Sequence, residues 1–251
     1  MSEIFQALWI GGKLSKMEQL AMKSFIDNGL EYHLYTYDNV PNVPDGVIIK
    51  DGNEILDKSE IFRYKNGSVS AFSNLFRFTM LYKKGGYWVD TDLACIKPFK
   101  FEADYVVVTE PSRDYKHAII TSCFIKLPKE SEAAKVGMVI QRIQKQQILN
   151  GTLAWGSGPQ TMQQVVARCN LHKYIVPWYT VCSCNWTSME SIVNSNYKCH
   201  PIVIKDFDKL PEGMVGIHFW NEVWRRNGLD KNADFDKKSI YERLKAKHNI
   251  N

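Results

Sequence analysis

Two carboxylates one residue apart are the strongest candidates for chemistry in this sequence. Asp90 and Asp92 directly follow residues 87–89, Tyr-Trp-Val, a short run typical of a buried strand. Alternate side chains of an extended segment point the same way, so both carboxylates can face one point at the rim of a sheet. Two negative charges that close repel each other unless a cation or a proton lies between them. The spacing favours a site for a hard divalent cation that also binds substrate phosphate oxygens, with a solvated acidic turn as the alternative.

The element that positions this pair is a predicted helix that has Ser68 and Ser70 as candidate caps and Lys83 and Lys84 in its last turn. Apolar residues recur at helical spacing over much of its circumference, so we expect the helix to be mostly buried. Gly85 can take the left-handed conformation that ends it. Arg77 is unusual on such a helix, because an unpaired buried guanidinium is costly. We therefore expect Arg77 either to bind a phosphate or to form an internal salt bridge, for which Asp90 is a candidate.

The N-terminal part of the chain predicts a parallel sheet. A strand at 7–10, a helix that starts at a capping box of Ser15 and Glu18, and a strand at 32–37 form a βαβ pattern. Ligands of such folds bind outside the carboxyl ends of the strands, which places residues 9–12 on the same rim as the acidic pair. Further strands are predicted at 46–50, 104–109, 119–127 and 215–220, and further helices at 58–66, 133–147, from 160 onward, and 239–247.

Composition is that of an ordinary globular protein of 251 residues, with 45% hydrophobic and 24% charged residues. The formal net charge of +5 suits a phosphate-bearing substrate, and no basic block indicates nucleic-acid binding. No apolar run approaches the roughly 20 residues that span a bilayer, so we expect no stable membrane insertion. The six cysteines include no Cys-x-x-Cys pair, and the N-terminus does not resemble a secretory signal. These features predict reduced thiols and a cytoplasmic location.

Three blocks of sequence resemble the glycosyltransferases that have a DxD-containing sugar-binding region. Residues 72–99 combine the hydrophobic helix, Gly-Gly, the aromatic strand and Asp-x-Asp, and the resemblance extends to LWIGG at 8–12 and to residues 217–231. Yeast-type mannosyltransferases and many bacterial and phage enzymes form this group, and clostridial toxin glucosyltransferases are more distant relatives. The resemblance implies a single GT-A-type α/β domain over 1–251. Its nucleotide-sugar-binding part would be about 1–110, and its acceptor and closing part about 111–251.

The resemblance also implies roles for individual residues. Asp90 and Asp92 would hold Mn²⁺ or Mg²⁺ and, with Arg77, form the catalytic group. A late histidine or acidic residue completes the metal site in this fold type. His218 is therefore a candidate third ligand, with Glu222 as its competitor and a core histidine as the alternative. Residues expected to bind the nucleotide sugar are Trp9, Gly11, Ser73, Asn74, Arg77, Trp88, Asp90 and Trp224.

Two of these positions have alternative interpretations. By resemblance Trp9 stacks on the nucleobase, whereas the residue pattern alone favours a core tryptophan beside a tight turn. This chain has Asn74 where the family usually has an aspartate, so the position can hydrogen-bond a sugar but brings no charge.

The implied reaction moves a sugar from a UDP- or GDP-sugar to an acceptor hydroxyl with retention of the anomeric configuration. The acceptor would be a glycan, a lipid, a protein or modified DNA. Two alternatives come from other classes. A non-catalytic nucleotide-sugar-binding protein is suggested by Asn74. A haloacid-dehalogenase-type phosphatase also uses Asp-x-Asp, but its pattern requires Thr or Val where this chain has Ala94.

Overall fold

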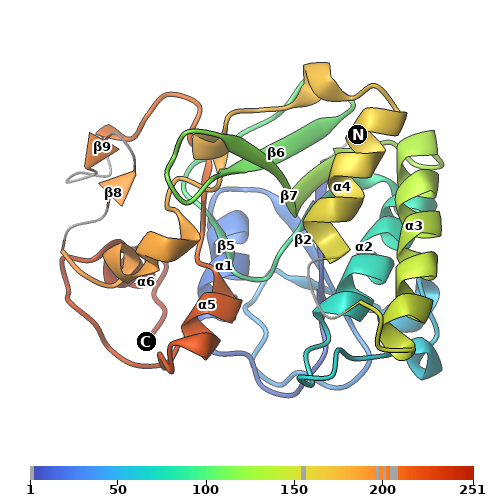
Figure 1. Cartoon of the computed structure of the whole chain (residues 1–251). Coiled ribbons are helices and arrows are strands. Elements are labelled where there is room, and N and C mark those ends of the chain that lie inside the picture. Colours follow the sequence, from blue (N-terminus) through green and yellow to red (C-terminus); the bar gives the residue numbers. More distant parts are fainter. Residues whose placement is uncertain (1–2, 154–156, 196–197, 200–201, 204–208) are drawn as a thin grey trace.

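A computed structural model describes residues 3–153, 157–195, 198–199, 202–203 and 209–251 of the chain (Figure 1). Its centre is a six-stranded sheet in the order β3-β2-β1-β4-β7-β6. The strands are β1 (Ile4–Trp9), β2 (Glu31–Thr36), β3 (Ile48–Asp51), β4 (Gly86–Val89), β6 (Val106–Pro111) and β7 (Ala118–Leu127). Strands β3, β2, β1 and β4 run parallel, and β7 pairs antiparallel with both β4 and β6. The predicted α/β fold with a mostly parallel sheet is confirmed.

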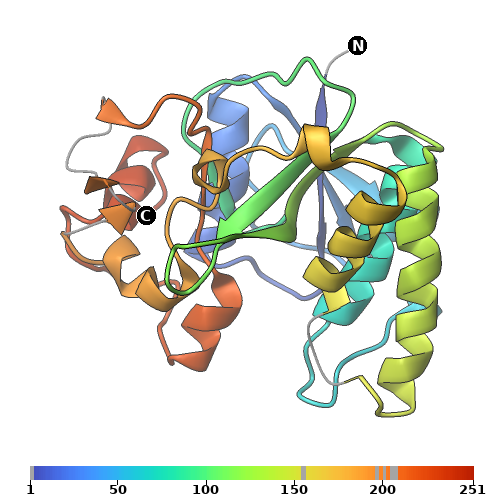
Figure 2. The same ribbon diagram turned by 45° about the horizontal axis from the view of Figure 1, so that its top comes forward.

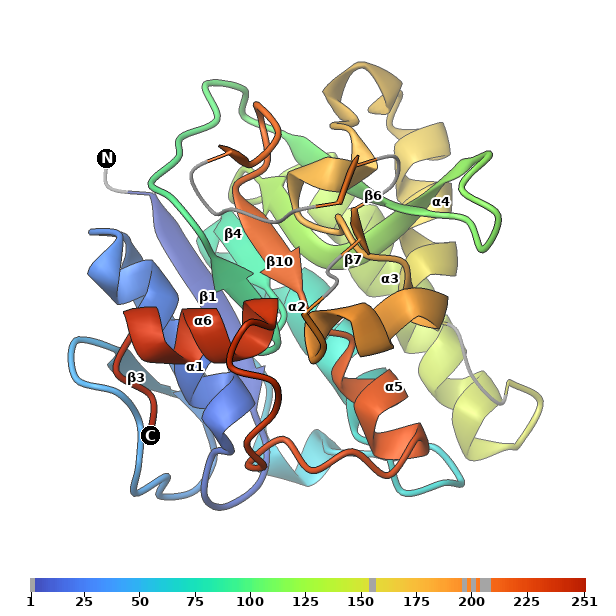
Figure 3. The same ribbon diagram turned by 90° about the vertical axis from the view of Figure 1, so that its left-hand side faces the viewer.

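Helices cover both faces of this sheet. On one face lie α2 (Ser70–Lys84), α3 (Glu132–Leu149) and α4 (Ser157–Arg168), which stand side by side in Figure 2. On the other face lie α1 (Lys16–Asp27) and α6 (Ile240–Lys247), in front of the sheet in Figure 3. Alternate side chains of β1 point to opposite faces of the sheet. Phe5 and Ala7 pack in the core cluster with α1 and α6, and Leu8 packs in the cluster with α2. The sheet is therefore buried on both faces.

Local sequence signals explain the ends of the elements that carry the site. Ser15 and Glu18 form the predicted capping box of α1. Gly85 ends α2 at a φ of +70°, and a Cβ there would lie 2.5 Å from the backbone nitrogen of Lys129, so no other residue fits this close approach. The helix predicted at 58–66 is wrong: only the short 3₁₀ turn η2 (Lys58–Glu60) forms, because Asp57 caps it and the chain then continues extended.

A second, two-stranded sheet brings a late segment of the chain to the end of β4. Strand β5 (Leu93–Cys95) pairs antiparallel with β10 (Gly216–His218). The strand predicted at 215–220 is shorter than expected, because Trp220 takes a left-handed conformation (φ 60°) that starts α5 (Asn221–Arg226). The remaining elements are η1 (Gly52–Glu54), η3 (His172–Tyr174), η4 (Trp178–Thr180), η5 (Trp186–Ile192), and the paired β8 (Lys198–Cys199) and β9 (Ile202–Val203).

None of the helices in these ranges has the length and apolarity that crossing a bilayer requires.

Candidate active site

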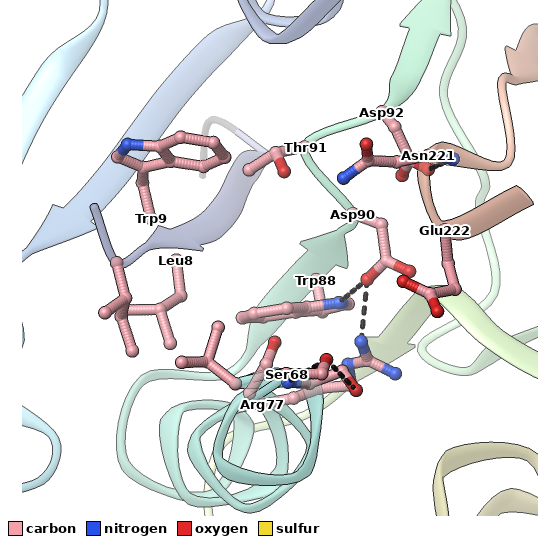
Figure 4. A pocket seen from close by; sticks show the side chains of 14 residues that line it. Leu8, Trp9, Ser68, Arg77, Trp88, Asp90, Thr91, Asp92, Asn221 and Glu222 are labelled. Atoms are coloured by element: carbon pink, nitrogen blue, oxygen red, sulfur yellow. Dashed lines mark hydrogen bonds and ion pairs between the residues drawn. The ribbon is translucent and has the colours of Figure 1, made fainter. Parts of the chain in front are cut away.

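The acidic pair lies in a turn between β4 and β5. Asp90 follows the last residue of β4, and the backbone N–H of Leu93 donates to the carbonyl of Asp90 at 3.2 Å. The extended backbone predicted for the pair is therefore wrong. The predicted convergence still occurs, because the turn gathers the two carboxylates with His218: one ligand atom of each lies within 4.8 Å of the others. Figure 4 shows Asp90 above Trp88 and Arg77, with Asp92 and Glu222 near it.

Asp90 is held by the helix beneath it and by its own strand. Arg77 Nη2 and Trp88 Nε1 both donate to Asp90 Oδ1 at 2.7 Å, and the guanidinium of Arg77 stacks 4.7 Å above the indole of Trp88. The internal salt bridge predicted as one role of Arg77 is present. Arg77 is 4% exposed, and its burial lowers the pKa of its guanidinium. Burial raises the pKa of Asp90, although the positive charge of Arg77 acts in the other direction and lowers it. Within the described part of the chain, Arg77 Nε and Nη1 are buried without a hydrogen-bond partner.

Asp92 is held from the late segment. The backbone N–H of Asn221 donates to Asp92 Oδ2 at 2.7 Å, and His218 Nε2 lies 3.3 Å from Asp92 Oδ1. Burial would raise the pKa of Asp92, but the charge of His218 and the hydrogen bonds keep that pKa below its ordinary value. Burial alone would lower the pKa of His218, because it disfavours the charged ring. The negative charge of Asp92 instead raises the pKa of His218 to about 10. The two carboxylates are thus placed in different electrostatic surroundings.

Two cavities meet at Asp90 and share Ser70, Arg77, Asp90 and Glu222. The first has a volume of about 260 Å³ and is also lined by Leu8, Trp9, Ile10, Ser68, Val69, Ser73, Trp88, Thr91, Asp92 and Asn221. The second has a volume of about 370 Å³ and is also lined by Tyr64, Asn74, Glu110, Thr121, Ser122, Cys123, Gly158, Pro159, Trp186, His218, Trp220, Val223 and Arg226. Figure 4 shows the Trp9 ring across the first cavity from Asp90 and Glu222.

Most predicted site residues line these cavities. Trp9, Ser73, Arg77, Trp88, Asp90 and Asp92 line the first, and Asn74 and His218 line the second. Gly11 lies beside the ring of Trp9 without lining either cavity.

Two predicted residues are placed differently from expectation. Trp224 is not brought to either cavity: its side chain is fully buried and packs against Phe235 and Tyr241 in the core. The carboxylate of Glu222 lines both cavities but is bonded to Arg225 and Arg226 at 2.7 to 2.9 Å.

Two contributors to the site were not predicted. The backbone N–H of Asn221 carries no residue-type signal, since any residue except proline supplies the same group. Glu110 could have been noticed as a carboxylate in a largely apolar strand; burial raises its pKa although Thr121 donates to it.

The comparisons with known proteins agree with this geometry. Residues 15–135 match the family model described as "Glycosyltransferase sugar-binding region containing DXD motif", and this range includes α2, Asp90 and Asp92. This match covers 121 of the 251 residues, including the acidic pair, and it identifies the chain as an enzyme of the glycosyltransferase class. No curated protein matches the chain.

Solved structures resemble the chain at low sequence identity. "PaToxG Glycosyltransferase" has a TM-score of 0.50 and 16% identity over 68% of this chain and 72% of its own, which shows a shared fold. The glycosyltransferase GlyE of Streptococcus pneumoniae TIGR4 has a TM-score of 0.49 and 10% identity, covering all of this chain and 65% of its own. The UDP-bound glycosyltransferase domain from the YGT toxin has a TM-score of 0.44 and 11% identity, covering all of this chain and 86% of its own.

Proposed function

We propose that this chain transfers a sugar from a nucleotide-diphosphate sugar to an acceptor hydroxyl, with a divalent cation held by Asp90 and Asp92. The observation that carries the proposal is the position of Asp90, which lines both cavities together with Arg77, while Asp92 lines the first. A donor in the first cavity would then present its sugar to an acceptor in the second. Transfer between two substrates needs such a shared boundary, because both must reach one reacting atom.

The residues present fit a hard divalent cation. Asp90, Asp92 and His218 each offer a ligand atom within 4.8 Å of the others, and two carboxylates with one imidazole suit Mn²⁺ or Mg²⁺. His218 is the better third ligand, because the carboxylate of Glu222 already pairs with two arginines. When bound, the cation would neutralise charge on the departing diphosphate and orient it.

The first cavity suits the nucleotide. The Trp9 ring is partly exposed there, fixed by donation of its Nε1 to the carbonyl of Gly12 at 2.9 Å, and can stack on a base. Arg77 lies at the other end. Its Nε and Nη1, which have no partner among the described residues, can donate to the phosphate or the sugar of the donor. Ser73 lines the same cavity one turn before Arg77 and can hydrogen-bond a sugar hydroxyl.

The second cavity suits the transferred sugar and the acceptor. Asn74, Thr121 and Ser122 offer neutral hydrogen-bonding groups, and Trp186 offers a ring that is 41% exposed. We expect front-face attack, in which the acceptor oxygen bonds to the anomeric carbon from the side that the phosphate leaves. The leaving phosphate then takes the acceptor proton, and the configuration is retained. NMR of the new linkage tests this, and an inverted anomeric carbon would refute it.

Binding of nucleotide sugars tests the proposal most directly. A thermal-shift screen of UDP- and GDP-sugars with Mn²⁺ or Mg²⁺, followed by donor hydrolysis, should find a donor that stabilises the chain only with the cation. Asp92→Asn should abolish that metal-dependent shift while the fold survives. Asp45→Asn, a neutralised carboxylate on an exposed loop, is the matched control and should keep it. Metal-dependent donor binding that is unchanged in Asp92→Asn would count against the site.

A binding protein without turnover is the second candidate, because Asn74 removes a charge that the family usually has beside the sugar. It predicts the same binding shift but no hydrolysis or transfer with any acceptor supplied.

A cytoplasmic location is supported by the free thiols at Cys95, Cys123, Cys169, Cys182 and Cys184; the side chain of Cys199 lies outside the described residues.

A further inference from the structure

We propose that Cys123, Cys182 and His218 form a binding site for a thiophilic divalent cation, with Zn²⁺ as the expected ion. Each residue offers a ligand atom, these atoms lie within 4.8 Å of one another, and all three residues are buried. Cys123 Sγ and Cys182 Sγ are 3.5 Å apart. A disulfide needs about 2.05 Å. Tetrahedral Zn²⁺ with Zn–S bonds of about 2.3 Å separates two sulfurs by roughly 3.8 Å, close to the spacing found.

One ring nitrogen of His218 already lies beside a carboxylate, as in most zinc-binding histidines. In such sites one ring nitrogen binds the metal and the other donates to a carboxylate, which fixes the ring. His218 Nε2 lies 3.3 Å from Asp92 Oδ1, whereas His218 Nδ1 is buried and has no hydrogen-bond partner among the residues that the structure describes. A buried imidazole nitrogen without a partner is unfavourable, and a cation beside the two thiols would provide one.

The three ligands stand on backbone segments that are bonded to one another. The carbonyl of Cys123 on β7 accepts from Asp90 N at 2.8 Å, and the carbonyl of Val181 accepts from His218 N at 2.8 Å. Cys182 N donates to the carbonyl of Trp178 at 2.9 Å. A site on such a framework is preorganised. Cys123 and His218 also line the second cavity, which gives an ion access and leaves room for a fourth ligand.

The shared histidine links this site to the acidic pair. A neutral imidazole has a free lone pair on one nitrogen only, so His218 can serve as ligand to one cation at a time. A cation bound at the thiols would therefore withdraw His218 from a cation at Asp90 and Asp92. This consequence, unlike the thiol site itself, rests on the proposed function. It predicts that Zn²⁺ slows donor hydrolysis and that Cys182→Ser resists this inhibition.

Cobalt titration tests the site with the full chain. The metal-free protein, kept reduced with a phosphine, is titrated with Co²⁺ and its absorption is recorded. We expect one tetrahedral Co²⁺ per chain with a thiolate-to-cobalt charge-transfer band, both displaced by Zn²⁺. Cys123→Ser and Cys182→Ser should lose the band. Cys184→Ser, a matched buried thiol two residues along whose Sγ contacts Ser188 O and Ser191 Oγ instead, should keep it.

The outcomes separate this site from the acidic pair. Asp90→Asn should leave the band unchanged, and Asp92→Asn should keep the band while weakening Co²⁺ binding about 10- to 100-fold, as loss of a supporting carboxylate does. A wild-type spectrum showing only octahedral Co²⁺ with oxygen ligands would overturn the proposal without touching the proposed function. The wild-type spectrum tests the thiol site even if a serine variant does not fold. A charge-transfer band that persists in Cys182→Ser would also overturn the proposed thiol site.

Discussion

Replacing Asp90 with asparagine should destabilise the protein far more than the same change at Asp92. Asp90 is the carboxylate that bonds Arg77, and Arg77 is 4% exposed with its Nε and Nη1 unpartnered in the described chain. An arginine cannot lose its proton to escape a buried, unpaired state. The partner of Asp92 is His218, which can become neutral when the carboxylate is removed.

The magnitude follows from the geometry. Breaking a buried ion pair by removing one partner costs about 3–5 kcal/mol. Asparagine keeps an acceptor oxygen for Arg77 and Trp88, so we expect the lower end, about 3 kcal/mol for Asp90→Asn. For a chain of this size each kcal/mol lowers the melting temperature by about 2–4 °C, which gives a decrease of roughly 6–12 °C. For Asp92→Asn we expect about 1 kcal/mol, the net value of a hydrogen bond.

Thermal unfolding of the metal-free proteins, followed by circular dichroism, measures these differences. The double variant Arg77→Met with Asp90→Asn should recover most of the lost stability, because it removes both charges. A melting temperature of Asp90→Asn within about 2 °C of wild type would refute the view that Arg77 depends on Asp90. A double variant less stable than Asp90→Asn alone would refute the electrostatic explanation.

Three further predictions address the cavities and the C-terminal helix. Trp9→Ala should weaken UDP or GDP binding about 10- to 100-fold in calorimetry, since stacking of a base on an aromatic ring contributes about 1–3 kcal/mol; unchanged affinity would remove Trp9 from the base site. Gly158→Ala should reduce donor turnover while leaving Mn²⁺ binding intact, because its Cβ would lie 2.7 Å from Ser122 Oγ and 2.9 Å from Asn74 Oδ1. Full turnover in this variant would show that the part of the second cavity beside Gly158 does not hold a substrate. Burial lowers the pKa of His248. The folded protein thus binds this proton more weakly than the unfolded chain, and the stability that neutral His248 contributes is lost as pH drops below about 6.5. His218, whose pKa is raised to about 10, has the opposite pH dependence in both proteins. From pH 7.5 to 5.5 the melting temperature of the wild type should therefore fall relative to that of His248→Gln, and an equal pH dependence of the two would contradict this.

Local signals predicted the parts of the fold that depend on neighbouring residues. The capping box at Ser15 and Glu18, the stop at Gly85 and the strand before Asp90 each follow from a few adjacent residues, and each is confirmed. The same reasoning failed at 58–66, where Asp57 caps a 3₁₀ turn of three residues and the backbone is already extended at Ile61. Local pattern thus predicts elements best where caps and apolar spacing agree.

The site was predicted only as far as residue types indicated it. Asp90, Asp92 and Arg77 were found because charge is unusual at the end of a buried strand and on an apolar helix. Trp224 carries the same residue type as Trp9 but packs in the core, and no local feature distinguishes the two. The thiol of Cys182 could not be connected with His218, because only the pairing of distant segments brings them together.

The ribbon formed by β5 and β10 has a consequence for biosynthesis. Asp92 and the Asn221 amide that fixes its carboxylate are 129 residues apart in the chain. A ribosome adds about 5–20 residues per second, so roughly 6 to 26 s separate the synthesis of these two residues. During that interval the nascent chain can already fold the helix and strands around Asp90, while Asp92 still lacks its hydrogen-bond donor. The two halves of the centre therefore mature in a fixed order, and the carboxylate of Asp92 is fixed only after Asn221 has been synthesised.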